Sequence, residues 1–427
     1  MKIAVVGGGA AGMATAYWLD QQGHHVTVFE RQPILGGHIR TLNKNVRPNC
    51  SNNNAILECG PLEFPSNFYN FIALMKELGV NLVPIDVGSA LFYKNGDRIL
   101  SPDLAKRNFA GAQRLVENIK FDSLHVRSAW LWLKTQLTHA DQLSGQSLSD
   151  YLGNLENGSA SSLWLKLLAM YSYSIPLHLI DDVPAELAIP MLDDYIAASW
   201  YRVEGGVYTY IEKILERFKG NIFLGVKITN IYRKSDGVEI EISTKETQVF
   251  DKVAIATPPD CVLKLLADPT ESETRRFSSW KPNYITSIVH SDTAMYDRQG
   301  IRAPAEFDFF QTDTQTATQW GYSGYLNRVC GLSSPQHYFL SFQLDSLIDP
   351  DHIIHTQRHH TPMYTTESFR YRSEIVETNG ENNTYYAGSY LGDGLHEGAI
   401  ASAREVARLV SETRKLEQNA FRETLQV

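Results

Sequence analysis

The sequence predicts an α/β fold organised around its N-terminal segment, and three features support this class. Lys2–Val6 is an apolar, β-branched run that leads directly into the glycine-rich turn Gly7-Gly8-Gly9-Ala10-Ala11-Gly12. Helix-forming residues follow this turn, and a second apolar run over residues 25–29 ends at Glu30. A strand, a G-x-G-x-x-G turn, a helix, a second strand and an acid in this order are typical of a dinucleotide-binding unit.

The glycine turn predicts how a dinucleotide is held. We expect Gly7 to permit the tight turn, Gly9 to let a diphosphate approach the backbone, and Gly12 to let the helix pack closely on the strand. Ala11 lies at the helix start, where N–H groups and the positive end of the helix dipole favour a phosphate. Glu30 has a carboxylate suited to both ribose hydroxyls, and its negative charge disfavours the 2′-phosphate of NADP.

Composition limits the classes of partner and the compartment. The chain has 427 residues, enough for about two domains, and a formal net charge of −9. Such a charge leaves no basic stripe, so we expect no nucleic-acid partner. The cysteines show no paired spacing, which favours a reducing cytoplasm over a disulfide framework or a metal cage; they are Cys50, Cys59, Cys261 and Cys330.

Hydropathy predicts no membrane-spanning segment. The first strand begins at residue 2, and no stretch of about 18 residues is apolar without interruption. We therefore expect a cytoplasmic protein without a signal peptide, and at most peripheral contact with a membrane.

The middle of the chain is richer in aromatic residues and poorer in charge than its ends. Residues 43–54 are rich in asparagine and predict a surface loop, whereas Tyr69–Leu78 predicts an amphipathic helix stopped by Gly79. Residues 163–180 are apolar on more than one helical face. They predict either a buried helix or a helix that lines an apolar substrate tunnel.

Four segments resemble the flavin amine oxidase superfamily, which includes monoamine oxidases, protoporphyrinogen oxidase and phytoene-desaturase-like enzymes. They are Glu30-Arg31-(x)4-Gly36-Gly37-His38-(x)2-Thr41, Val203-Glu204-Gly205-Gly206-Val207, Tyr386-Ala387-Gly388-Ser389 and Glu397-Gly398-Ala399-Ile400. The resemblance implies a glutathione-reductase-like, FAD-binding Rossmann domain interleaved with an α+β substrate domain of mixed sheet plus helices. It also implies FAD, which we expect to bind non-covalently because no cysteine or histidine lies in an obvious attachment motif.

The resemblance assigns segments to two discontinuous domains. Residues 1–85, 205–264 and 375–427 would form the FAD-binding domain, and residues 86–204 and 265–374 the substrate-binding domain. It also assigns FAD contacts beyond the glycine turn: Arg31, Gly36, Gly37 and His38 near the diphosphate, Gly60, Pro61 and Leu62 beside the flavin ring, Val226 at the adenine, and Gly388, Ser389, Glu397, Gly398 and Ala399 around flavin N1 and O2.

Three residues are candidates for a catalytic role. Amine-oxidising members typically place a lysine near flavin N5 and an aromatic cage beside the ring. The matching positions here are Thr286 and Leu395, and both departures disfavour amine oxidation. His396 lies just before the flavin-contacting turn and is a candidate general acid or base, or alternatively a packing residue.

A run of histidines admits two interpretations. His352, His355, His359 and His360 form H-x-x-H-x-x-x-H-H. No Cys, Asp or Glu lies at matching spacing, so we expect loop histidines and no metal site, although residues 360–364 could line the cavity.

Within the superfamily the chain resembles a bacterial amine-oxidase-like branch linked to fatty acid modification. This resemblance rests on Gly36-Gly37-His38, residues 60–64 and 69–80, His290-Ser291-Asp292, residues 360–364 and Gly388-Ser389-Tyr390-Leu391-Gly392. It implies a desaturase, dehydrogenase or isomerase that moves a hydride at an activated C–H of an apolar substrate, such as an unsaturated fatty acid or isoprenoid. An amine or amino acid oxidase that releases hydrogen peroxide, and a non-catalytic FAD-binding protein, stay open as alternatives. The oligomeric state is not predicted.

Overall fold

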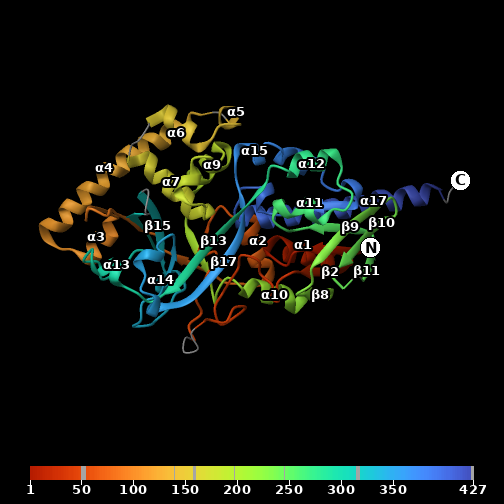
Figure 1. The fold of residues 1–427 in the computed structure, drawn as a ribbon, viewed down its shortest axis with the longest axis horizontal. Helices are drawn as coiled ribbons and strands as arrows, with labels where there is room; N and C mark the ends of the chain where they lie inside the picture. Colours follow the sequence, from red (N-terminus) through yellow and green to blue (C-terminus); the bar gives the residue numbers. More distant parts are fainter. Residues whose placement is uncertain are drawn as a thin grey trace.

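Two β-sheets, drawn from different parts of the chain, organise the molecule. The structure, a computed structural model, describes residues 1–427 apart from 50–53, 139, 157–159, 197, 245, 314–317 and 425–427. Cys50 and part of the asparagine-rich loop therefore lie outside the described residues. Figure 1 shows an elongated molecule with one sheet towards each end, and the C-terminus at one tip.

The first sheet is parallel and is built around the N-terminal strand. Its order is β18-β12-β1-β2-β8, and every pairing is parallel. A strand covered on both faces is apolar throughout, which explains why β1 lacks alternation: Ile3 and Val5 belong to one core, and Ala4 and Val6 to the other. The strands are β1 (Lys2–Val6), β2 (His25–Glu30), β8 (Asn221–Leu224), β12 (Lys252–Ile255) and β18 (Thr384–Tyr386).

Helices cover one face of this sheet, and a small antiparallel sheet covers the other. The helices are α1 (Ala10–Gln21), α2 (Tyr69–Leu78), α10 (Thr209–Arg217) and α17 (His396–Thr424), and the strands are β9 (Ile228–Lys234), β10 (Gly237–Ile242) and β11 (Thr247–Phe250). Helix α2 has the predicted bounds because Gly79 takes the left-handed conformation, φ +71°, that ends a helix. This layering confirms the predicted Rossmann-type unit.

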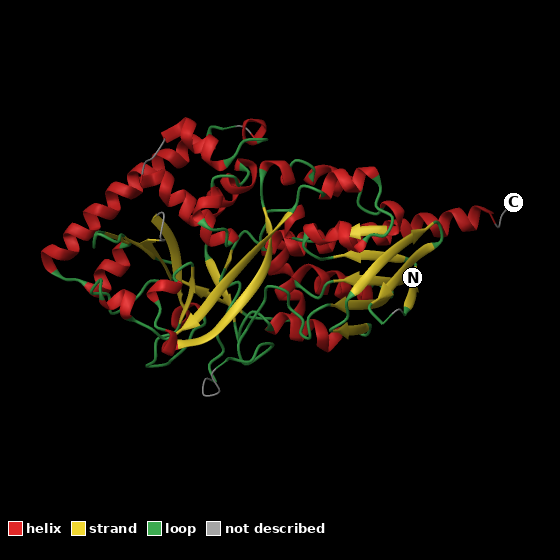
Figure 2. Ribbon diagram, viewed as in Figure 1, coloured by secondary structure: helices red, strands yellow, loops and turns green. Residues whose placement is uncertain are grey.

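The second sheet is mixed, with order β17-β13-β16-β15-β14-β5-β6 and one parallel pair, β14 with β5. Its strands are β5 (Ser89–Phe92), β6 (Arg98–Leu100), β13 (Lys281–His290), β14 (Phe307–Asp313), β15 (Thr318–Tyr325), β16 (Phe339–Phe342) and β17 (Ile353–Met363). Figure 2 shows the long pair β13 and β17 crossing the middle of the molecule. The predicted mixed sheet is confirmed, but the sequence did not indicate β5, β6, β15 or β17.

Helices from the middle of the chain pack around the mixed sheet. They are α3 (Pro102–Asn108), α4 (Gly111–Gln136), α5 (Ala140–Leu143), α6 (Leu148–Glu156), α7 (Ala160–Tyr173), α8 (Leu177–Ile180) and α9 (Ala185–Ile196). Shorter helices complete the chain: α11 (Val262–Leu265), α12 (Glu271–Phe277), α13 (Ala294–Asp297), α14 (Leu326–Val329), α15 (Thr366–Phe369) and α16 (Arg372–Glu377). A third small sheet, β3 (Phe64–Pro65), β7 (Trp200–Val203) and β4 (Leu82–Ile85), joins segments assigned to different domains.

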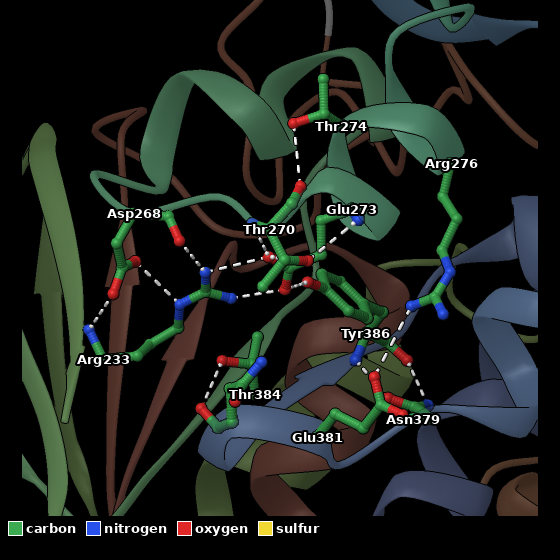
Figure 3. A network of polar contacts seen from close by, with 11 residues as sticks. Arg233, Asp268, Thr270, Glu273, Thr274, Arg276, Asn379, Glu381, Thr384 and Tyr386 are labelled. Atoms are coloured by element: carbon green, nitrogen blue, oxygen red, sulfur yellow. Dashed lines mark hydrogen bonds and ion pairs between the residues drawn. The ribbon is translucent and has the colours of Figure 1, made fainter. Parts of the chain in front are cut away.

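A polar network fixes the end of β18, immediately before the segment expected to contact the flavin (Figure 3). Arg233 on β9 donates to Asp268 at 2.9 Å and to Glu273 on α12 at 2.9 Å. Tyr386 donates its hydroxyl to the same Glu273 carboxylate at 2.8 Å. Glu273 also closes a capping box with Thr270 at the start of α12. One carboxylate therefore connects a strand, a helix cap and the last strand of the parallel sheet.

Candidate cofactor and substrate site

One cavity of about 1210 Å³ lies between the two sheets and is lined by residues from both. At one end it contains the glycine turn and Glu30, and at the other a group of aromatic side chains that includes Tyr171 and Tyr322. A cavity of this size is large for a drug-sized ligand and fits a dinucleotide together with a second molecule.

The glycine turn distinguishes packing glycines from a ligand-facing one. A Cβ on Gly12 would lie 1.8 Å from the carbonyl oxygen of Gly7, and one on Gly7, whose φ is +108°, would lie 2.6 Å from that of Ala256. At Gly9 the nearest atom to an added Cβ is 3.6 Å away, so the protein itself leaves room for a side chain there. Gly9 lines the cavity, and its bare backbone is the cradle that a diphosphate requires.

The second glycine pair, Gly36-Gly37, packs against the glycine-rich turn. The Gly36 amide donates to the carbonyl of Gly8 at 2.8 Å, and Gly9 and Gly36 form a parallel bridge. A Cβ on Gly37 would lie 2.9 Å from the Gly9 Cα. The two pairs, distant in sequence, thus form one backbone surface on the cavity wall.

Glu30 is held at the end of β2 by backbone amides. Its carboxylate accepts from the amides of Gly8 and Gln32, each at 2.7 Å, and it lines the cavity beside Arg31. Val226 also lines the cavity, but its amide already donates to the backbone carbonyl of Glu30 at 3.0 Å. Glu30 and Val226 thus lie where a ribose and an adenine could bind. The Val226 N–H already donates within the protein, so it is not free to donate to an adenine.

A buried arginine, which the sequence analysis missed, supplies positive charge near the diphosphate position. Arg40 is 7% exposed, donates to the carbonyls of Leu35 and Ile39, and lines the cavity. His38 also lines the cavity, and its Nε2–H donates to the His360 carbonyl at 2.7 Å; desolvation lowers the pKa of this ring. In the superfamily that the chain resembles, an arginine often follows the second glycine pair directly. His38 takes that place here, and the arginine lies two positions later, at residue 40.

The first part of the asparagine-rich loop supports this region. Asn45 donates to the carbonyls of Leu35 and Ile39 at 3.0 and 2.8 Å and accepts from the amide of Thr41 at 2.9 Å. Residues 43–49 are exposed or half-buried, as expected of a surface loop, but the Asn45 side chain turns inwards and supplies hydrogen bonds to the backbone.

The residues predicted around the flavin fall into two groups. Gly60, Pro61, Leu62, Gly388, Ser389 and Ala399 line the cavity, as does Leu395. Glu397 does not: its carboxylate accepts from the amides of Asn70 and Phe71 at 2.8 and 2.9 Å and so caps α2. Gly398 is also absent from the wall, since its amide donates to Asp393 at 2.8 Å.

Thr286 is not among the residues that line the cavity, although its neighbours Ile285 and Ser287 and its cross-strand partner Arg358 are. Ser287 Oγ donates to the carbonyl of Cys59 at 2.9 Å, and His359 Nε2–H donates to the same oxygen at 2.8 Å. These two side chains fix the backbone just before Gly60.

His355, His359 and His360 lie on β17, so the loop prediction was wrong for these three, whereas His352 ends the turn that precedes the strand. His355 and His359 are 8% and 6% exposed. Burial lowers the pKa of His359 to about 3, which leaves it neutral. His360 donates to Asp260 at 2.9 Å, and Cys261 is close to both, but Lys264 also pairs with Asp260 at 3.2 Å. We interpret this cluster as an ion-pair network, because a lysine already neutralises the carboxylate.

His396 lines the cavity and also packs against aromatic rings. Phe64 and Phe71 pack edge-on against it, with centroids 5.2 and 5.1 Å away, and Tyr210 shares a 2.8 Å hydrogen bond with its Nε2. Burial lowers its pKa to about 3. This arrangement favours a packing role over proton transfer.

The far end of the cavity is aromatic and contains one carboxyl group. Helix α7 contributes Tyr171 to the wall while burying Leu167 and Met170, so both interpretations of residues 163–180 apply to it. Glu63, also missed from the sequence, accepts a hydrogen bond from the Tyr171 hydroxyl. Its other oxygen is buried and lacks a hydrogen-bond partner among the described residues, and burial raises its pKa to about 7.

Known proteins resemble this chain in sequence and in fold. The family model described as flavin containing amine oxidoreductase matches residues 10–291. An L-amino-acid oxidase from Siganus canaliculatus is 24% identical over 70% of this chain and 58% of its own length. The chain spans less than two thirds of the length of the curated relatives that it matches first.

Solved structures share the fold. The CLA-producing fatty acid isomerase from P. acnes aligns with a TM-score of 0.68 and 16% identity, covering 96% of this chain and 98% of that one. Cyclohexylamine oxidase from Brevibacterium oxydans IH-35A aligns with a TM-score of 0.67 and 12% identity, covering 97% and 99%. At these identities the likeness concerns the fold alone.

Proposed function

Because the chain belongs to the family of flavin containing amine oxidoreductases, we propose that it is an FAD-dependent oxidoreductase acting on an activated C–H bond of an apolar substrate. Bound FAD supplies the hydride acceptor, and for an isomerase it also returns the hydride. The protein supplies binding, orientation and exclusion of water. Desaturation, dehydrogenation and isomerisation all fall within this proposal.

The observation that carries the proposal is the composition of the substrate end of the cavity. Its wall contains the aromatic side chains Tyr171, Tyr173, Tyr195, Trp200 and Tyr322. Such a surface binds a substrate by burial of apolar area, at roughly 25 cal/mol per Å². The rings of Tyr171 and Phe307 stack with centroids 4.5 Å apart, which makes this wall rigid.

The polar groups near the flavin position support the same conclusion. Strand β13 presents Ile285 and Ser287 to the cavity, and no cavity-lining residue of this strand is a lysine. Burial lowers the pKa of His359 and His396 to about 3, so neither imidazole adds positive charge to the cavity wall near neutral pH.

Glu63 favours a second candidate, an amine or amino acid oxidase that releases hydrogen peroxide. A carboxyl group in an aromatic pocket, with one oxygen lacking a partner, fits a substrate ammonium group. Ammonium binding would stabilise the charged carboxylate and lower the raised pKa of Glu63.

Turnover of two substrate panels by wild type and Glu63→Gln separates the candidates. We expect unsaturated fatty acids to yield products with altered double bonds, detected by mass spectrometry, and the variant to retain most of this activity. Peroxide release from amines that falls at least about tenfold in the variant, as expected for loss of a charge-assisted contact, would instead establish the oxidase.

A further inference from the structure

Helix α4 carries an apolar stripe that faces away from the protein. At 100° per residue, positions 115, 119, 126, 130, 133 and 137 fall within about 60° of the helix circumference and extend over roughly 33 Å. The side chains are large and exposed: Leu115 60%, Ile119 59%, Val126 69%, Trp130 58%, Leu133 45%, and Leu137 75% just beyond the helix. Figure 1 shows α4 at the edge of the molecule opposite the C-terminus.

The opposite face of α4 already packs on the protein. Leu124 and Leu131 are buried there, and Glu117 pairs with Arg98 at 3.0 Å. Helix α4 contacts β6 and α7 through this side. The exposed stripe is thus a second apolar surface on a helix that is already docked, and large exposed side chains gathered along one face mark an interaction site.

Basic residues lie along one side of the stripe. At 100° per residue Lys134, Arg127 and Lys120 lie about 40°, 60° and 80° beyond one edge, whereas Asp122 lies about 20° beyond the other. Lys134 lies over the ring of Trp130 at 5.6 Å, and Lys120 pairs with Asp97 at 2.6 Å. This face is basic on a chain whose formal net charge is −9.

We propose that α4 docks the protein on an anionic lipid membrane, with the helix lying in the plane of the interface. An apolar stripe with an interfacial tryptophan and one basic side is complementary to acyl chains below and negative headgroups beside it. A second copy of the chain fits less well, since antiparallel pairing of two stripes would bring the two basic sides together. No described helix is long and apolar enough to cross a membrane, so the contact is peripheral.

The position of α4 suits a lipid-using enzyme. Helix α4 packs on α7, and α7 carries Tyr171 and Tyr173 to the cavity wall. Docking would hold the substrate half of the molecule at the lipid surface. This delivery role rests on the proposed function, whereas membrane binding itself does not.

Vesicle co-sedimentation of the holoenzyme tests the proposal. Wild type should bind phosphatidylcholine vesicles that contain phosphatidylserine and bind pure phosphatidylcholine at least about tenfold more weakly, with binding reduced by salt. The Val126→Ser/Trp130→Ser variant should lose at least about tenfold in partition coefficient, and Arg127→Glu/Lys134→Glu should lose binding to the anionic vesicles. The matched control is Val249→Ser, an equally exposed valine (62%) on the antiparallel sheet, which should bind as wild type does.

Flavin content and unfolding temperature equal to wild type verify that the variants fold. Absence of wild-type binding to anionic vesicles, or unchanged binding by both double variants, would overturn the proposal. A dimer in sedimentation velocity that the Val126→Ser/Trp130→Ser variant abolishes would also overturn it and assign the stripe to a second copy. Turnover of a soluble short-chain substrate should be unchanged in these variants, so loss of docking is distinguishable from failure of the proposed reaction.

Discussion

Glu63 is the residue whose ionisation should be visible in stability. Burial, opposed by the hydrogen bond from Tyr171, raises its pKa from 4.5 to about 7, so the folded state holds a proton that the unfolded state releases. The contribution of Glu63 to the free energy of unfolding therefore falls as pH rises from about 4.5 to about 7, and it stays at its lowest value above pH 7. Glu63→Gln removes this pH-dependent loss, and we predict that the variant is more stable than wild type by about 1–3 kcal/mol at pH 8.

Denaturant unfolding at pH 5 and pH 8 measures this effect. Wild type and Glu63→Gln should differ little at pH 5 and clearly at pH 8. Parallel stability curves for the two proteins across this range would show that Glu63 titrates normally.

Glu30 tests the ribose assignment. Glu30→Ala removes the acceptor for the amides of Gly8 and Gln32 together with the expected ribose contacts. Hydrogen bonds to a charged group contribute about 1.5–3 kcal/mol each, so FAD affinity should fall at least tenfold. The measurement is the flavin-to-protein ratio after gel filtration, with the exposed Glu216→Ala as control; an unchanged ratio in Glu30→Ala would count against the assignment.

His396 distinguishes packing from proton transfer. In His396→Gln we expect the pH profile of flavin reduction to keep its shape between pH 5 and pH 8, because the ring is neutral throughout that range. Lost packing against Phe64 and Phe71 should lower stability by about 1–3 kcal/mol. Stopped-flow reduction over this pH range decides the matter: a limb that vanishes in the variant would make His396 an acid or base.

At the scale of elements, the network around Glu273 connects a strand, a helix cap and the flavin-facing turn. Glu273→Ala leaves the Arg233 guanidinium and the Tyr386 hydroxyl short of a partner. Breaking such a buried pair costs about 3–5 kcal/mol, whereas Glu239→Ala, which removes a more exposed partner of Lys234, should cost less than about 1 kcal/mol. Thermal unfolding checks both, and equal midpoints for the two variants would contradict the role of the network.

Elements with local signals were predictable, and elements defined by distant partners were not. Helix α2 follows from its amphipathic pattern and Gly79, and β1 from an unbroken apolar run. Strand β17 was missed because its histidines, glutamine and arginine look like a loop; they become a strand by pairing with β13. The exposed stripe of α4 was missed because apolar spacing alone does not reveal which helical face is buried.

At the scale of the whole molecule, one end of the cavity is formed by a local sequence motif, whereas the other end is formed by residues far apart in the chain. The glycine-rich end of the cavity is built from the short segment Gly7 to Gly37, so the sequence alone could name most of its wall. The substrate half depends on contacts such as Tyr171 with Glu63 and Ser287 with Cys59, which are 108 and 228 residues apart. No sequence pattern pairs such residues, so Glu63 and Ser287 emerged only from the fold.

The central claim is that the cavity between the two sheets passes a hydride from an apolar substrate to bound FAD. Anaerobic absorbance of the purified holoenzyme, challenged in turn with unsaturated fatty acids and with amines, tests it most directly. We predict loss of the oxidised flavin band, or double-bond migration without net loss, with the lipid and no change with the amines. Loss of the band with amines alone would contradict the account and establish an amine oxidase.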